Sequence, residues 1–183
     1  MKTLALIGMA ACAGLFGCAA PPAATPLDED AAFLQDRARQ DLIEIRMGEL
    51  AQRYAQLPDV AAYGRRMTAE HDESLAALRG IALDRRIALP AAPDDAGLDS
   101  YYQLSRIGGD DFHRQYMDRA LFFQRGEIST LQREAASGGD ARLVAFARDR
   151  EPMAAGDTAL GIDVEVKNHL NFPIAPAGGG NVR

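Results

Sequence analysis

The stretch DVAAYGRRMTAEHDESLAALRGIALDRR, residues 59–86, decides the fold of this chain. Its apolar and small residues recur three and four positions apart, which is the spacing of one face of an α-helix. The residues of that face are Val60, Tyr63, Gly64, Met67, Leu75, Leu78 and Ala82. We therefore expect an amphipathic helix whose apolar face packs against other helices.

Helical signals continue on both sides of this stretch. A first helix follows Thr25-Pro26, where threonine caps the helix and proline takes the first position, and it runs to about Leu57. After the quoted stretch, a loop over residues 90–97 leads to a short helix over residues 98–107. The sequence thus places one short helix in the long connection that follows its second long helix.

Two more long helices complete the predicted domain. The third begins at about residue 110 and ends at the glycine pair 138–139. Asp140 caps the fourth, which extends to about residue 168 and contains Pro152. We expect Pro152 to kink or break this helix, because its ring removes a hydrogen bond and clashes with the preceding turn.

The pattern of elements predicts an all-α fold. No alternating polar and apolar pattern of useful length indicates a strand. Four long helices favour an up-down-up-down four-helix bundle with a longer connection between the second and third helices. The bundle would occupy residues 27–169, and residues 170–183, which contain prolines and glycines, would form a flexible tail.

Composition limits the classes of function. The chain has 183 residues, of which 48% are hydrophobic and 25% are charged, so it is long enough for one buried core. Its formal net charge of -6 argues against a nucleic-acid partner, since a polyanion would be repelled.

The N-terminus indicates export and lipid attachment. Lys2 and the short apolar run that follows it are typical of a signal peptide, which we place at residues 1–17. The run ends in Leu15-Phe16-Gly17-Cys18, which resembles a bacterial lipobox with Cys18 as the lipidated residue. Residues 18–26, rich in proline and alanine, would tether the domain to the membrane.

Two other interpretations of the N-terminus stay open. Met9-Ala10-Ala11-Cys12 is a second candidate lipobox, although it leaves a very short hydrophobic core. An ordinary secretory signal with a coincidental cysteine is the other. By resemblance to lipoprotein sorting, Ala19 after the cysteine favours the outer membrane, with the domain facing the periplasm.

Each long helix carries one polar residue on its apolar face. Positions four, seven and eleven apart lie near one line along a helix, so such a residue should point inward. These residues are Glu44, His71, Gln124 and Asp157. His113 is about three turns from Gln124, too far to share a site, and we expect it to be partly exposed.

The four inward residues support two hypotheses. Glu44, His71 and Asp157 would bind one divalent ion such as Zn, Mn or Fe(II), with Gln124 as a weak fourth ligand or an orienting group. Alternatively, the four form a structural polar cluster without metal, in which Arg150 neutralises one carboxylate. No Gly-rich phosphate loop, zinc-type cysteine pair or catalytic triad is recognisable in the sequence.

Several segments resemble the domain-of-unknown-function family numbered 4142. They are Glu44-Ile45-Arg46-Met47-Gly48-Glu49-Leu50-Ala51, Arg66-Met67-Thr68-Ala69-Glu70-His71, Gly109-Asp110-Asp111-Phe112-His113-Arg114-Gln115-Tyr116-Met117, Phe146-Ala147 and Pro152. The resemblance implies a bacterial envelope protein or lipoprotein with a ferritin-like helical domain and no established activity.

The chain departs from that family at three positions. Family members generally have histidine at the positions of Gln124 and Asp157, and aspartate at that of His113, so only Glu44 and His71 carry over. A ferritin-type di-iron site is not expected either, because His71 has no Glu three residues earlier. We expect a non-enzymatic binding, structural or stress-protective envelope lipoprotein, with a metal-binding or weakly redox-active protein as the alternative.

Overall fold

The computed structural model describes residues 26–170, and the fold is entirely helical over that range. The all-α prediction is therefore confirmed for the described residues. The predicted signal peptide, the Cys18 lipobox, nearly all of the tether and nearly all of the C-terminal tail lie outside them. The helices are α1 (Pro26–Tyr54), α2 (Pro58–Arg85), α3 (Asp95–Leu104), α4 (Gly109–Ser137) and α5 (Ala141–Lys167).

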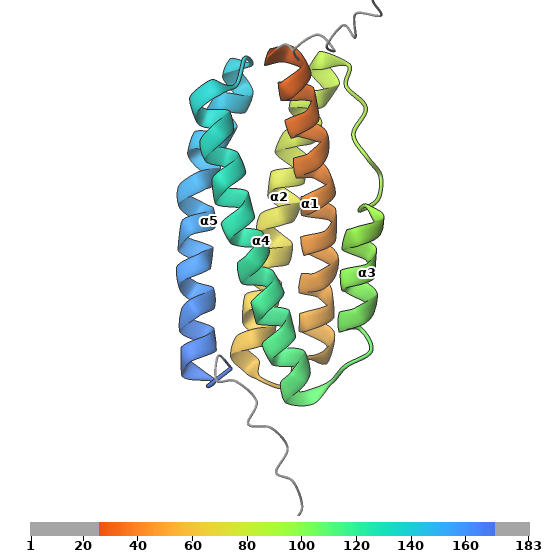
Figure 1. The fold of residues 1–183 in the computed structure, drawn as a ribbon, viewed down its shortest axis with the longest axis vertical. Helices are drawn as coiled ribbons and strands as arrows, with labels where there is room; N and C mark the ends of the chain where they lie inside the picture. The colour runs from red at the N-terminus through yellow and green to blue at the C-terminus, as the bar shows by residue number, and fades with distance from the viewer. Residues whose placement is uncertain (1–25, 171–183) are drawn as a thin grey trace, which may run out of the picture.

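The four long helices form two antiparallel hairpins that pack side by side (Figure 1). α1 pairs with α2 and α4 pairs with α5, while α1 also contacts α4 and α2 contacts α5. Asp30, near the start of α1, accepts a hydrogen bond from the backbone N–H of Gly139, just beyond the end of α4. Asp59, near the start of α2, pairs with Lys167 at the end of α5. Neighbouring long helices are therefore antiparallel.

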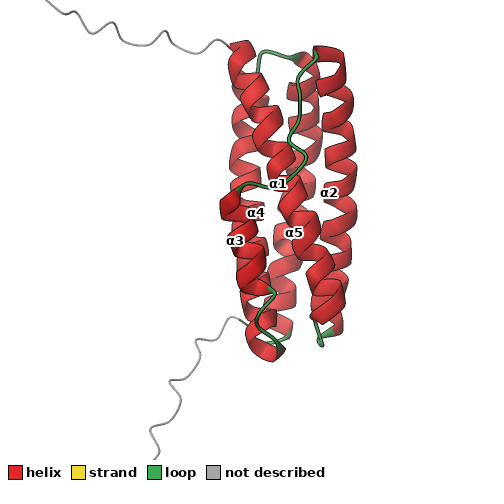
Figure 2. Ribbon diagram, turned by 90° about the vertical axis from the view of Figure 1, so that its right-hand side faces the viewer, coloured by secondary structure: helices red, strands yellow, loops and turns green. Residues whose placement is uncertain are grey.

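The order of helix directions differs from the expected up-down-up-down arrangement. α1 is antiparallel to both α2 and α4, so the second and third long helices, α2 and α4, run parallel on opposite corners of the bundle. The cause is the connection between them, which runs back along the outside of the bundle and contains α3 (Figure 2). A connection of that length returns the chain to the end at which α2 began.

Capping side chains explain where α3 and α5 begin. Asp94 caps α3 by accepting a hydrogen bond from Gly97 N–H, and Asp140 caps α5 by accepting from Arg142 and Leu143. The expected disruption at Pro152 does not interrupt α5, which continues from residue 141 to 167. Pro152 and Arg148, four residues before it, are both exposed. Solvent can therefore reach the carbonyl that the missing N–H leaves free.

The interior of the bundle contains two apolar clusters, one towards each end. The first includes Tyr63, Met67, Phe112, Tyr116 and Val164, and the second includes Leu34, Leu75, Leu78, Leu131 and Leu143. On α2 and α4, His71, Ser74, Gln124 and Glu127 lie between the positions that contribute to these two clusters, whereas Asp30, His113 and Glu134 are buried nearer the ends of the bundle. The middle of the core thus contains a charged layer, made up of Arg37, Asp41, Glu44, His71, Glu127 and Arg150.

Two glycines allow α1 and α2 to approach closely beside this layer. A Cβ atom added to Gly64 would lie 2.7 Å from the Cβ of Ala51 and 2.9 Å from the carbonyl oxygen of Gly48. A Cβ added to Gly48 would lie 2.5 Å from the hydroxyl of Thr68. The separation of α1 and α2 therefore depends on the absence of side chains at both positions.

Candidate functional site

His71 lies at the centre of the charged layer and is fully buried. Its Nδ1 atom is 2.9 Å from Oδ1 of Asp41, and its Nε2 atom is 2.9 Å from Oε2 of Glu44, both on α1. Burial opposes the charged form of the ring, but the Glu44 carboxylate and the hydrogen bonds to both carboxylates outweigh it and raise the pKa of His71 to about 10. At neutral pH the ring is an imidazolium between two carboxylates.

Asp41 is held in place from three directions. Arg37 donates to its Oδ1 atom at 2.6 Å, Ser74 donates to Oδ2 at 2.8 Å, and His71 contacts it from α2. Burial would raise the pKa of Asp41, but the Arg37 charge and the hydrogen bond to His71 lower it below its usual value. Asp41 is consequently ionised and orients the His71 ring.

Two arginines extend the network across the bundle. Arg37 on α1 also lies 3.5 Å from Glu44 and 3.4 Å from Glu127 of α4. Glu127 accepts a hydrogen bond at 3.0 Å from Arg150 of α5, which in turn donates at 2.8 Å to Glu70 of α2. All four long helices therefore contribute charges to one continuous set of ion pairs.

Gln124 of α4 is fully buried against the other face of this network. Its Nε2 atom lies 3.3 Å from Oε2 of Glu44, 3.2 Å from Nε2 of His71 and 3.2 Å from the sulfur of Met67. Its Oε1 atom is buried without a hydrogen-bond partner. The sequence-based expectation that Glu44, His71 and Gln124 meet in the core agrees with this arrangement.

Asp157 points inward, as the periodicity of α5 indicates, and is fully buried. Its carboxylate, however, does not pair with His71 but with Arg66. Asp157 binds Arg66 at 2.6 Å, five residues before His71 on α2, and its backbone carbonyl accepts from Tyr63. Five residues correspond to about 7.5 Å along a helix. Burial raises the pKa of Asp157, although Arg66 opposes the shift. Asp157 therefore does not join Glu44 and His71 directly, although Arg66 also pairs with Glu70 at 2.9 Å and so connects Asp157 to the same set of ion pairs.

Glu127, and not the predicted Asp157, is the second carboxylate beside Glu44 and His71. Among the described residues, Glu44, His71 and Glu127 form a group whose potential ligand atoms all lie within 4.8 Å of one another. Arg150, expected to neutralise a carboxylate, binds Glu127 and Glu70.

Arg37, Asp41 and Glu127 were not predicted as site residues, although the sequence carries a signal for each. Arg37 and Asp41 lie seven and three residues before Glu44, on the same helical face, and Glu127 lies three residues after Gln124. Each of them is a further polar residue on a helix for which only one inward polar residue was predicted. The candidate site is therefore richer in charge than the sequence analysis indicated.

His113 differs from its expected exposure, because it is almost fully buried. Its Nε2 atom accepts hydrogen bonds from the backbone N–H groups of Gln56 at 3.0 Å and Leu57 at 3.4 Å. Burial lowers the pKa of His113, against the opposing effect of Asp110, and this favours the neutral ring that can accept. His113 stabilises the turn between α1 and α2 and lies outside the charged layer.

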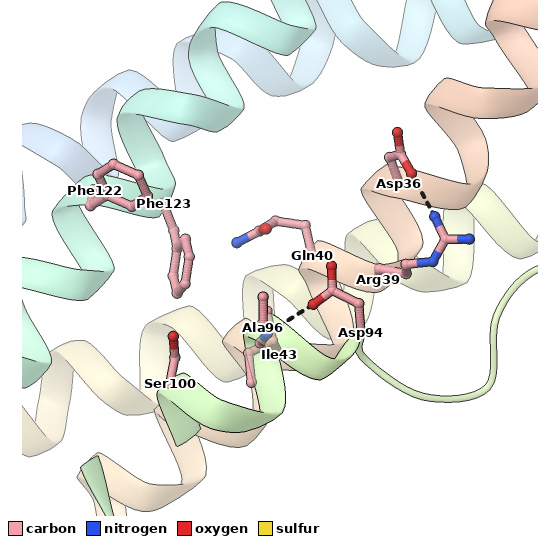
Figure 3. A pocket seen from close by; sticks show the side chains of 10 residues that line it. Asp36, Arg39, Gln40, Ile43, Asp94, Ala96, Ser100, Phe122 and Phe123 are labelled. Carbon is pink, nitrogen blue, oxygen red and sulfur yellow. Dashed lines mark hydrogen bonds and ion pairs between the residues drawn. The ribbon is translucent and has the colours of Figure 1, made fainter. Parts of the chain in front are cut away.

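A cleft of about 520 Å³ lies between α1, α3 and α4 (Figure 3). Phe123 from α4 and Gln40 from α1 reach into it, and the side chain of Gln40 also donates to Oε1 of Glu44 at 3.0 Å. A neighbouring depression shares these two residues and is also lined by Arg37 and Glu127. The cleft thus connects the surface with the edge of the charged layer.

The fold and the charged layer define a helical-bundle protein with an ion-paired core. The chain belongs to the family described as "Domain of unknown function (DUF4142)", whose model matches residues 17–159. This confirms the resemblance found in the sequence.

One solved structure with a similar fold is the crystal structure of a DUF305 fragment from Deinococcus radiodurans. Its TM-score is 0.67 at 13% sequence identity, and the match covers 80% of this chain and 99% of that chain. At this identity the likeness concerns the fold alone. A comparison with curated proteins finds no match.

Proposed function

We propose that this chain is a lipoprotein of the bacterial cell envelope whose helical bundle is a non-enzymatic structural or binding module. The lipobox ending at Cys18 and the Pro/Ala tether support the envelope location. Within the described part of the chain, no helix has the length and apolarity needed to span a bilayer. The bundle itself is proposed to be ferritin-like, because one long crossover joins two parallel helices, as in that group of folds.

The observation that carries the non-enzymatic role is the self-compensation of the buried charges. Arg37, His71 and Arg150 each lie within 3.0 Å of a carboxylate of the same chain. A catalytic acid or base needs access to a substrate, whereas these groups are engaged with one another. Such a layer specifies how the four helices meet and supports a stable module presented at a membrane surface.

Mass spectrometry of the mature N-terminus tests the location. We expect cleavage before Cys18 and the mass of a triacylated cysteine, recovered in the outer-membrane fraction. Cys18→Ser should abolish lipid attachment, while the matched variant Cys12→Ser should not, because Cys12 would leave with the signal peptide. A mature protein without lipid, or lipid on Cys12, would contradict the proposal.

A metal-binding function is the second candidate, and the group of Glu44, His71 and Glu127 favours it. One imidazole and two carboxylates suit Zn, Mn or Fe(II), and the Asp41 contact fixes the ring as in many metal-binding histidines. Against it, Arg37 already supplies a cation near both Glu44 and Glu127. A bound metal would have to displace the His71 proton and tolerate this arginine.

Elemental analysis after loading with Zn, Mn and Fe(II) separates the two candidates. The non-enzymatic module predicts metal far below one ion per chain. The metal-binding candidate predicts near-stoichiometric metal that is lost in His71→Ala and in Glu127→Gln. Asp157→Asn serves as the matched control, because that carboxylate binds Arg66 and does not join Glu44 and His71 directly, so its loss should leave metal content unchanged.

A further inference from the structure

Three atoms that can each act as a metal ligand surround the amide nitrogen of Gln124. They are Sδ of Met67, Nε2 of His71 and Oε2 of Glu44, at 3.2, 3.2 and 3.3 Å. Because His71 is an imidazolium whose Nε2–H faces Glu44 at 2.9 Å, that nitrogen has no lone pair to accept a hydrogen from the amide. The other end of the same amide, Oε1, has no hydrogen-bond partner although Gln124 is fully buried. The amide is thus a poor match for the atoms around it.

The surroundings of His71 resemble the setting of a metal ligand. Its Nδ1 atom contacts Asp41 at 2.9 Å, and Asp41 is fixed in turn by Arg37 and Ser74. Histidines that bind metals through one nitrogen commonly donate the other N–H to a carboxylate, which sets the orientation of the ring. This arrangement directs Nε2 of His71 towards Glu44 and the Gln124 amide, whose nitrogen also contacts Met67.

We propose that Met67 Sδ, His71 Nε2 and Glu44 Oε2 form a binding site for Cu(I). The metal would displace the side-chain amide of Gln124 and the proton on His71 Nε2, which is released to solvent, so the net charge of the site is unchanged. Thioether and imidazole ligands select soft ions such as Cu(I), whereas Mg²⁺, Ca²⁺ and Mn²⁺ prefer oxygen ligands. The inference rests on the metal-binding candidate above and shares Glu44 and His71 with it, but it replaces Glu127 by Met67 and the expected ion by Cu(I). The Glu44 carboxylate supplies the compensating negative charge.

The structure also indicates a route for the ion. A small cavity beside the site is lined by Glu44, Met67 and Phe123, among others. Phe123 also lines the cleft between α1, α3 and α4, into which its ring points (Figure 3), so the same side chain borders both the cleft and the small cavity. Rotation of Phe123 would open a path from the surface to Met67 and Glu44. Phe123→Ala should therefore accelerate Cu(I) uptake.

Competition with the chromophoric Cu(I) chelator bicinchoninate, without oxygen, tests the site. The full chain is used with Cys12→Ser and Cys18→Ser, so that no thiol competes. We expect one Cu(I) per chain, and a loss of affinity of at least about tenfold in Met67→Leu, which keeps the side-chain volume but removes the sulfur. Met117→Leu is the matched control, because Met117 is also buried but is not one of the proposed ligands, so this substitution should leave the Cu(I) affinity unchanged.

Gln124→Ala provides the second variant. Removing the amide should tighten Cu(I) binding about tenfold, since the metal no longer displaces its hydrogen bonds. X-ray absorption should show copper–sulfur scattering in the parent chain and in Gln124→Ala, but not in Met67→Leu. Circular dichroism of each variant confirms that the helices are retained.

The outcomes distinguish this inference from the metal-binding candidate. Equal Cu(I) affinity in Met67→Leu and the parent chain would overturn the proposed ligand set. Stoichiometric Zn, Mn or Fe(II) without Cu(I) binding, even in Gln124→Ala, would overturn the Cu(I) site and leave the metal-binding candidate intact. Absence of binding by all of these ions would overturn both.

Discussion

Asp41 on α1 and His71 on α2 share a buried hydrogen bond of 2.9 Å, and this contact links α1 to α2 within the charged layer. Asp41 is also bound by Arg37 and Ser74, so one carboxylate compensates two cationic side chains and satisfies a hydroxyl.

Asp41→Asn should lower the free energy of unfolding by about 3–5 kcal/mol, because it leaves Arg37 and His71 buried with less compensation. Urea denaturation followed by circular dichroism measures the change. Asp36→Asn on the same helix is the matched control, because that carboxylate is exposed and its ion pair with Arg39 contributes about 1 kcal/mol or less. Similar losses in both variants would show that the buried network does not stabilise the fold.

Gly64→Ala should destabilise the bundle, because the new methyl group would meet Ala51 and the backbone of Gly48. Overpacking of this kind costs about 1–3 kcal/mol. Gly80→Ala on the same helix meets nothing within 4 Å and should be neutral or stabilising by up to about 1 kcal/mol. Thermal unfolding of the two variants in parallel checks the prediction, and an unchanged midpoint for Gly64→Ala would refute the close helix approach.

Glu134→Gln should make stability less dependent on pH. Burial and the neighbouring Asp30 carboxylate raise the pKa of Glu134 from 4.5 to about 7, and Asp140 adds to this while Arg85 opposes it. The stability contributed by the neutral acid is complete below pH 4.5 and is lost as the pH rises through about 7. The variant should therefore match the parent chain in acid and exceed its stability above pH 7.

Unfolding midpoints measured between pH 4 and 8.5 would show the two stability profiles separating as the pH rises. Glu49→Gln on α1 serves as the control, because Glu49 is exposed and its replacement should leave the pH profile of the parent chain unchanged. Parallel profiles for Glu134→Gln and the parent chain would rule out the titration of Glu134 in this range.

His113→Phe should weaken the turn between α1 and α2. The ring volume is kept, but the backbone N–H groups of Gln56 and Leu57 lose their acceptor, which costs about 1–3 kcal/mol when they stay buried. Hydrogen exchange provides the specific readout. The amides of Gln56 and Leu57 should exchange faster in the variant, and unchanged protection at both would contradict the role assigned to His113.

The sequence alone predicted much of the architecture. The all-α class, the short helix in the long connection and the cap at Asp140 follow from local rules of periodicity and capping, and the structure agrees with each. The same rules placed Glu44, His71 and Gln124 on inward faces, because a helix repeats its direction every three to four residues. These predictions required information from one helix at a time.

Tertiary structure decided what no single helix contains. Periodicity gives the direction of a side chain around its helix but not its height relative to another helix, so Asp157 points inward yet meets Arg66, while Glu127 meets the layer around His71. The parallel course of α2 and α4 depends on where the long connection packs. Arg37 becomes part of the core for a similar reason, since a buried guanidinium is stable only where packing brings Asp41, Glu44 and Glu127 around it.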